Sequence, residues 1–113
     1  MAKKVAVVIQ EDPRKTHRPV EALRIALGLV SGSHMTTVVL LNEATRLLSE
    51  ETEDIIDVEI LEKYLPSIKH LEIPFLLPLQ TDRSTIQSEF LAQYETPDNI
   101  RLFLQSVDCA LVF

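Results

Sequence analysis

The feature of this sequence that most constrains its fold is a set of short apolar runs spaced along the chain. Each run holds only a few residues and is rich in Val, Ile and Leu, as strands covered on both faces of a sheet are. The runs are residues 4–9, 36–41, 73–77 and 109–113. Pro74 and Pro78 flank the third run, which restricts it to a very short strand or places it near an edge of the sheet.

Amphipathic helices are predicted between the first runs. Residues 19–30 repeat apolar side chains every three or four positions, as a helix of about three turns does. Asn42 is placed to cap a short helix over residues 43–50. A further helix runs through residues 60–68 and begins near Asp57.

The second half of the chain is patterned less clearly. Residues 80–94 are interpreted as a loop that leads into a short helix. The apolar side chains of that helix are Ile86, Phe90 and Leu91. Thr96 and Pro97 are a good helix start, because Thr caps and Pro suits the first turn. The apolar face of this last helix consists of Ile100, Phe103 and Leu104.

Strands that alternate with helices predict one α/β domain over residues 1–113, with a doubly wound, mainly parallel sheet and helices on both faces. No apolar run approaches the ~20 residues that a membrane-spanning helix needs. The N-terminal segment lacks the apolar core and cleavage site of a signal peptide, so the expected location is the cytoplasm. A net charge of −6 argues against nucleic acid as a partner, since that binding requires clustered Lys and Arg.

The motifs of common cofactor and metal sites are missing. Two glycines are too few for the phosphate loops of nucleotide-binding folds. One cysteine and three scattered histidines do not have the spacing of metal ligands. Hydrolase signatures such as G-x-S-x-G are also missing. The sequence therefore assigns no cofactor, no metal and no catalytic residue.

Polar residues follow the predicted strands at the edge where open α/β sheets bind ligands. The candidate binding residues are Gln10, Glu11, His17, Asn42, Gln80 and Asp82. We predict that His17 and Asn42 share one cleft, in which His17 could move a proton. The plainer interpretation is that these residues are polar because loops are polar.

Cys109 is the single cysteine, and its position decides whether thiol chemistry is available. It lies in the apolar run near the end of the chain. Because its neighbours are those of a packed strand, we predict a buried, structural thiol. The alternative is an exposed thiol that reacts.

Four segments resemble the DsrE/DsrF-like family, which includes the TusBCD sulfur-relay subunits. They are KKVAVVIQ, VEALRIALGLVSG, TTVVLLNEATRLL and FLQSVDCALVF, and the resemblance is strongest over residues 3–48 and 97–113. Sulfur-carrying members of the family have a cysteine in the loop after the third strand. The matching stretch, IPFLLPLQTDR, has none, and Leu79 or Gln80 falls near that position.

The resemblance implies a non-catalytic oligomeric subunit or scaffold, with sulfur-relay proteins as partners. The alternatives are a persulfide carrier that uses Cys109 and a protein that binds a small ligand at the carboxyl edge of its sheet. Family members commonly form trimers or hexamers, which favours a homo-oligomer here. The predicted helix at 19–30 has a second apolar stripe that needs a cover, either from a second subunit, which the family resemblance favours, or from another helix of the same chain. That stripe consists of Ala22, Ile25, Ala26 and Leu29.

Overall fold

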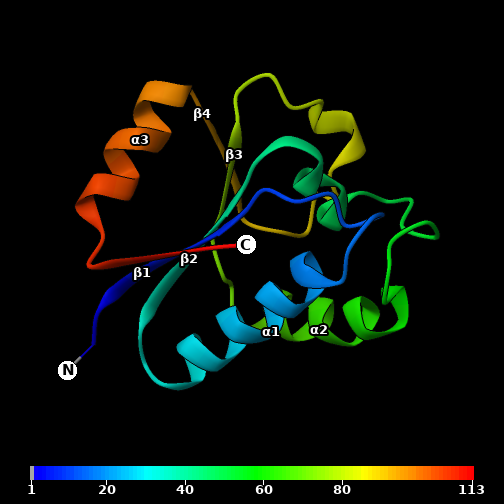
Figure 1. The fold of residues 1–113 in the computed structure, drawn as a ribbon, viewed down its shortest axis with the longest axis horizontal. Helices are drawn as coiled ribbons and strands as arrows, with labels where there is room; N and C mark the ends of the chain where they lie inside the picture. The colour runs from blue at the N-terminus through cyan, green and yellow to red at the C-terminus, as the bar shows by residue number, and fades with distance from the viewer. Residues whose placement is uncertain (1) are drawn as a thin grey trace.

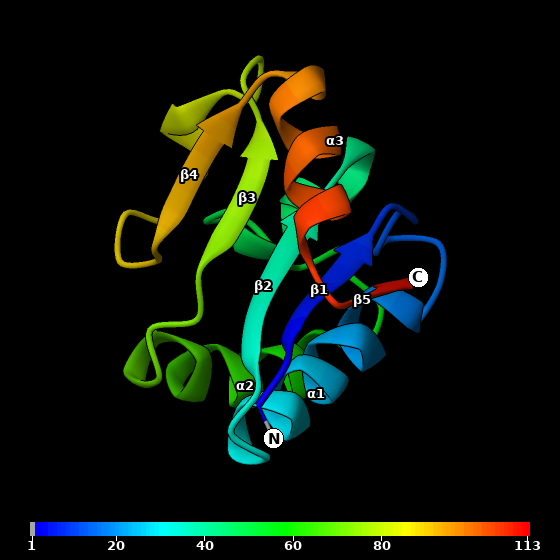
Figure 2. The same ribbon diagram turned by 90° about the vertical axis from the view of Figure 1, so that its left-hand side faces the viewer.

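The computed structural model describes residues 2–113 and contains a parallel sheet of five strands in the order β4-β3-β2-β1-β5 (Figures 1 and 2). The confirmed fold class is thus α/β with a parallel sheet. The elements in chain order are β1 (Lys4–Ile9), α1 (Arg18–Ser31), β2 (Met35–Leu40), the 3₁₀ helix η1 (Asn42–Leu48), α2 (Val58–His70), β3 (Phe75–Pro78), the 3₁₀ turn η2 (Arg83–Thr85), β4 (Ala92–Glu95), α3 (Pro97–Ser106) and β5 (Cys109–Val112).

Helices cover the two faces of the sheet unequally. Figure 1 shows α1 and α2 side by side on one face and α3 alone on the other. Successive side chains of β1 supply both layers, because side chains alternate across a strand. Val7 and Ile9 join the large apolar cluster under α1 and α2. Ala6 and Val8 join a much smaller cluster under α3.

Helix α3 determines where the last strand lies. It starts directly after β4, at one edge of the sheet, and β5 pairs with β1 at the opposite edge. On the way α3 crosses β3, β2 and β1, whose side chains meet Ile100 beneath it. This crossover leaves β5 with one neighbour only, as Figure 2 shows.

The second apolar stripe of α1 is covered largely within the chain. Ala22 and Ala26 are fully buried in the cluster that also contains Leu61 and Ile68 of α2. The chain forms this contact itself because α1 and α2 pack side by side over the same face of the sheet. The stripe therefore gives no support to the prediction of a homo-oligomer.

The predicted helix near the end of residues 80–94 is wrong. That region contains η2, an isolated bridge at Ile86, a turn at residues 88–89 and the strand β4. Ile86 and Phe90 are buried, but as separate anchors of a loop. Ile86 forms an isolated bridge with Ser49, and the Phe90 ring packs edge-on against Phe75 with ring centroids 6.0 Å apart. Ile86 and Phe90 are four residues apart because each makes its own contact, not because they share one face of a helix.

Candidate functional site

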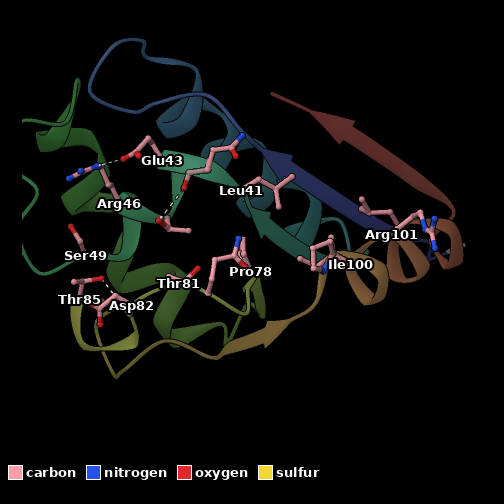
Figure 3. Close-up of a pocket in the computed structure, with 15 residues that line it drawn as sticks. Leu41, Glu43, Arg46, Ser49, Pro78, Thr81, Asp82, Thr85, Ile100 and Arg101 are labelled. Atoms are coloured by element: carbon pink, nitrogen blue, oxygen red, sulfur yellow. Dashed lines mark hydrogen bonds and ion pairs between the residues drawn. The ribbon is translucent and has the colours of Figure 1, made fainter.

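A pocket opens at the carboxyl ends of β2 and β3, on the side of the sheet that carries α3. Its volume is about 660 Å³, which is within the range of small-molecule sites. Its walls are η1, the loop between β3 and η2, and the first turns of α3 (Figure 3). The chain leaves β2 and β3 toward the α1–α2 face but leaves β4 into α3, on the opposite face. Open α/β sheets bind ligands at the place where the connections from neighbouring strands go to opposite faces of the sheet.

The floor of the pocket is apolar. Leu41 follows β2 directly, and Pro78 is the last residue of β3. Ile100 and Leu104 lie one turn apart on α3 and present their side chains to the same space. Ile100 is itself buried against the sheet, which fixes the helix over the pocket.

The wall formed by η1 begins with a left-handed residue. Asn42 has φ 55°, a conformation that Asn tolerates better than most residues. Its side chain does not cap η1, so the cap predicted for Asn42 is wrong. Instead, Thr45 Oγ1 donates to the Asn42 carbonyl oxygen over 3.3 Å. Arg46 Nε lies 2.6 Å from Glu43 Oε2, so the Arg46 charge is already paired (Figure 3).

The opposite wall is a tight turn built around Asp82. Its carboxylate accepts hydrogen bonds from the Ser84 backbone N–H over 3.0 Å and from Ser84 Oγ over 2.6 Å. These two hydrogen bonds lower the pKa of Asp82, because they stabilise the ionised form. Thr85 Oγ1 donates to the Asp82 carbonyl oxygen over 2.7 Å. One oxygen of the carboxylate, Oδ1, therefore accepts both hydrogen bonds and holds the loop in shape.

Several polar side chains at the pocket can meet a ligand, among them Asn42, Gln80 and Arg101. Asn42 and Gln80 line the pocket and make no side-chain hydrogen bond within residues 2–113. Arg101 stands at the rim of the pocket (Figure 3). Its guanidinium Nη2 forms an ion pair with Asp98 Oδ1 over 3.5 Å, and both side chains are largely exposed. Ion pairs of this kind contribute little, so Arg101 can turn toward an anionic group. The pocket thus combines an apolar floor with amide and guanidinium donors at its rim.

The structure brings together three of the six candidate binding residues. Asn42, Gln80 and Asp82 line the pocket. Gln10, Glu11 and His17 are not among its lining residues.

The other three residues belong to the loop after β1. Glu11 pairs with Arg18 over 2.7 Å, and the Gln10 backbone N–H donates to the Phe113 carbonyl oxygen over 2.8 Å. His17 is exposed at the start of α1. The predicted common cleft of His17 and Asn42 is therefore not formed, because the chain turns after β1 toward the face opposite α3.

Two loops are tied together next to the pocket by Arg14. Its guanidinium donates to both carboxylate oxygens of Asp12, over 3.1 and 2.9 Å, and lies 3.5 Å from Glu43 Oε2. The hydrogen bonds from Arg14 lower the pKa of Asp12 to about 2. Arg14 thus links the loop after β1 to η1, which forms a wall of the pocket.

Cys109 does not line the pocket, and its exposure contradicts the prediction that the thiol is buried. It is exposed at the start of β5, on the outer edge of the sheet. An apolar run predicts burial only where strands or helices cover it on all sides, and β5 has a neighbour on one side. Leu79, near the position of the family's cysteine, is also exposed, and its backbone N–H donates to the Glu95 carbonyl oxygen over 2.8 Å.

Other kinds of site were not found in the part of the chain that the structure describes. Residues 2–113 contain no group of three or more His, Cys, Asp or Glu side chains arranged to hold a metal ion. Within the same residues, none of the helices has the length and apolarity needed to cross a bilayer.

Comparisons with known proteins identify the fold. No protein-family model matches the sequence, and a search of curated proteins finds no match. Among solved structures, the crystal structure of the ychN protein from E. coli is similar, with a TM-score of 0.77. The two share 15% sequence identity, and the match covers 98% of this chain and 99% of the ychN chain. The chain therefore has the DsrE-like α/β fold that its sequence segments resemble.

Proposed function

We propose that this chain is a non-catalytic DsrE-like subunit that binds a small, largely apolar molecule in the pocket at the ends of β2 and β3. It acts in the cytoplasm as part of a homo-oligomer, in or near sulfur-relay metabolism. The observation that carries the binding function is the pocket itself, with its apolar floor and unpaired amides at its rim. The DsrE-like fold supports the link to sulfur relay.

The chemistry of the lining favours binding over catalysis. No thiol or imidazole is found among the residues that line the pocket. The Glu43 carboxylate is paired with Arg46, and the Asp82 carboxylate is held by Ser84. The hydrogen bonds from Ser84 lower the pKa of Asp82, which makes its carboxylate a weaker base, and general acid–base catalysis works best with a group whose pKa lies near the working pH.

A direct test uses anilinonaphthalene sulfonate, which has an apolar body for the floor and a sulfonate for Arg101. The wild-type chain should bind this probe and gain stability, by about 2.7 kcal/mol when the probe is at a hundred times its dissociation constant. Thr81→Trp should weaken binding, because the indole fills space at the pocket wall. Gln105→Trp is the matched control, since Gln105 is exposed on α3 and does not line the pocket. Equal binding by all three chains would contradict the proposal.

A persulfide carrier is the second candidate, and the exposure of Cys109 favours it. In that reaction the Cys109 thiolate attacks the outer sulfur of a donor persulfide, and the donor leaves as a thiolate. Mass spectrometry after incubation with a small-molecule persulfide would show a gain of one sulfur atom. Cys109→Ser is the control, and a wild-type mass that stays unchanged would exclude this candidate.

The oligomeric part of the proposal is tested by light scattering at micromolar concentration. A trimer or hexamer gives a mass that is a multiple of the 12.8 kDa chain. A mass equal to that of one chain would contradict it.

A further inference from the structure

The pocket at the ends of β2 and β3 is bordered by charged side chains of both signs. They are Glu43, Arg46, Asp82 and Arg101. Glu43 and Arg46 neutralise each other, because Arg46 Nε lies 2.6 Å from Glu43 Oε2. The charges that remain for a ligand are therefore those of Asp82 and Arg101.

The Asp82 carboxylate carries a negative charge that no cation of the described chain neutralises. Hydrogen bonds from Ser84 lower the pKa of Asp82, so the group is ionised at neutral pH. Both of these hydrogen bonds go to Oδ1, which leaves Oδ2 for a ligand. No Lys, Arg or His side chain within residues 2–113 forms an ion pair with Asp82. The neighbouring Arg83 lies over the Tyr94 ring instead, with its Cζ atom 4.3 Å from the ring centroid.

The surroundings of Asp82 add further negative charge. A smaller hollow of about 360 Å³ adjoins the pocket and shares Arg46, Ser49 and Thr85 with its wall. The acids that line this hollow form no ion pair within residues 2–113. They are Glu50, Glu51, Glu53 and Asp54. A cationic group of a ligand is therefore attracted to the Asp82 end of the pocket.

Arg101 gives the other end of the pocket a positive charge. Figure 3 shows Asp82 at one end of the pocket and Arg101 at the opposite end. Within residues 2–113, Arg101 forms an ion pair with Asp98 alone, over 3.5 Å, and both side chains are largely exposed. Exposed pairs of this kind contribute little. A ligand carboxylate that accepts two hydrogen bonds from the guanidinium can therefore replace Asp98.

We infer that the ligand of this pocket is an elongated zwitterion with an apolar middle, whose ammonium group meets Asp82 and whose carboxylate meets Arg101. Leu41, Pro78 and Ile100 lie between the two ends and contact the apolar middle (Figure 3). The inference rests on the proposed binding function and names the class of molecule that is bound. ω-Amino carboxylates and short apolar peptides with free ends share this chemistry.

An amine at the far end of the ligand is the diagnostic feature. An ammonium group that lies on the apolar floor without a partner lowers affinity, because an unpaired charge is expensive to remove from water. An added amine therefore improves binding only where it reaches a carboxylate. The comparison between an ω-amino carboxylate and the alkyl carboxylate of equal length thus reports on the Asp82 end of the pocket.

Isothermal titration calorimetry with matched series of probes tests the ligand class. The probes are ω-amino carboxylates of increasing chain length, with alkyl carboxylates and alkylamines of the same lengths. The wild-type chain should bind the best ω-amino carboxylate about tenfold more tightly than the matching alkyl carboxylate. This advantage should be greatest at one chain length, because only that length reaches both ends of the pocket. Apolar peptides with free ends form a parallel series, and the series that binds more tightly identifies the source of the ligand.

Two charge-removing variants assign the ends of the ligand to residues. Asp82→Asn keeps an oxygen for the hydrogen bonds from Ser84 and should abolish the advantage of the amine, with binding of alkyl carboxylates unchanged. Arg101→Gln should weaken binding of every carboxylate by about tenfold and leave binding of alkylamines unchanged. Asp98→Asn is the matched control, since Asp98 does not line the pocket, and it should weaken no probe. Circular dichroism confirms that each variant is folded.

The outcomes separate this inference from the proposed function on which it rests. If anilinonaphthalene sulfonate binds, but the wild type binds ω-amino and alkyl carboxylates equally at every length, the zwitterion is wrong and the binding function stands. If Asp82→Asn keeps the preference for the amine, or Arg101→Gln keeps full affinity for carboxylates, the assigned ends are wrong and the inference is overturned. If neither anilinonaphthalene sulfonate nor any probe of the series binds, the binding function is wrong as well.

Discussion

At the scale of single residues, the exposure of Cys109 makes its reactivity the first measurable consequence. The thiol is exposed on β5, an edge strand of the sheet. In folded protein it should therefore react with a chromogenic disulfide reagent within several-fold of its rate in denaturant. Cys109→Ser should change the free energy of unfolding by less than about 0.5 kcal/mol, as exposed substitutions do. A reaction that is a hundred times slower in the folded state would show that the thiol is covered.

A second residue-level prediction concerns Asp12 and the dependence of stability on pH. The pKa of Asp12 is lowered to about 2 by the hydrogen bonds from Arg14. A carboxylate with a lowered pKa stabilises the folded state above its unfolded pKa, and this contribution is lost as the pH falls from about 4 to 2. Because Arg14 is partly exposed, water screens the pair, and we expect a contribution of about 1 kcal/mol.

Asp12→Asn tests this contribution by urea unfolding at two pH values. The variant should be less stable than the wild type at pH 7 and equally stable near pH 2, where Asp12 loses its charge. Glu53→Gln is a control, because Glu53 is an exposed acid with no ion pair among residues 2–113. A difference between wild type and Asp12→Asn that does not change with pH would refute the electrostatic explanation.

At the scale of elements, the start of α3 is fixed by its cap. Thr96 Oγ1 accepts a hydrogen bond from the Asn99 backbone N–H over 3.2 Å, and Pro97 occupies the first turn. Thr96→Ala should lower the free energy of unfolding by about 1 kcal/mol, and Thr96→Ser should restore most of it. Chemical denaturation measures both. Equal stability of the Ala and Ser variants would mean that the hydroxyl does not contribute.

Elements with a regular period were predictable from the sequence. The strand at Lys4–Ile9, the helix at Arg18–Ser31 and the capped helix after Thr96 are all found where the pattern placed them. The strand at Ala92–Glu95 was missed because it is only four residues long: Ala92 and Tyr94 pack against the large cluster and Gln93 is exposed, but so short an alternation does not stand out in a sequence. A local pattern of apolar residues indicates that a segment is buried. It does not identify which of the buried strands lies at an edge of the sheet.

Local sequence patterns also explain why only part of the candidate site was predicted. Asn42, Gln80 and Asp82 were found because they directly follow strands that the pattern revealed. The apolar floor was missed, since Ile100 and Leu104 look like ordinary core residues of a helix. Recognising β4 would have pointed to the start of α3 as a pocket wall. His17 was misplaced because the direction in which the chain leaves β1 depends on tertiary packing.

At the scale of the whole molecule, the two layers should differ in local stability. The large cluster joins α1, α2, η1 and the sheet, whereas α3 is held by a small cluster around Ile100. Opening α3 alone exposes far less apolar surface than opening α1, so it requires less free energy. Amide hydrogens of α3 and β5 should therefore exchange faster than those of β1 and β2, with opening free energies below that of global unfolding.

Two side-chain truncations in the core distinguish opening of α3 and β5 alone from unfolding of the whole molecule. Leu23→Ala, under α1, should lower the global free energy of unfolding by about 2–5 kcal/mol and raise exchange throughout the sheet. Ile100→Ala should raise exchange mainly in α3 and β5, because these elements can open while the larger cluster stays packed. Mass spectrometry of exchanged peptides distinguishes the two patterns. If Ile100→Ala accelerated exchange in α1 and β2 as much as in α3, the molecule would unfold as one cooperative unit, and the small cluster would stabilise the sheet as much as the large one does.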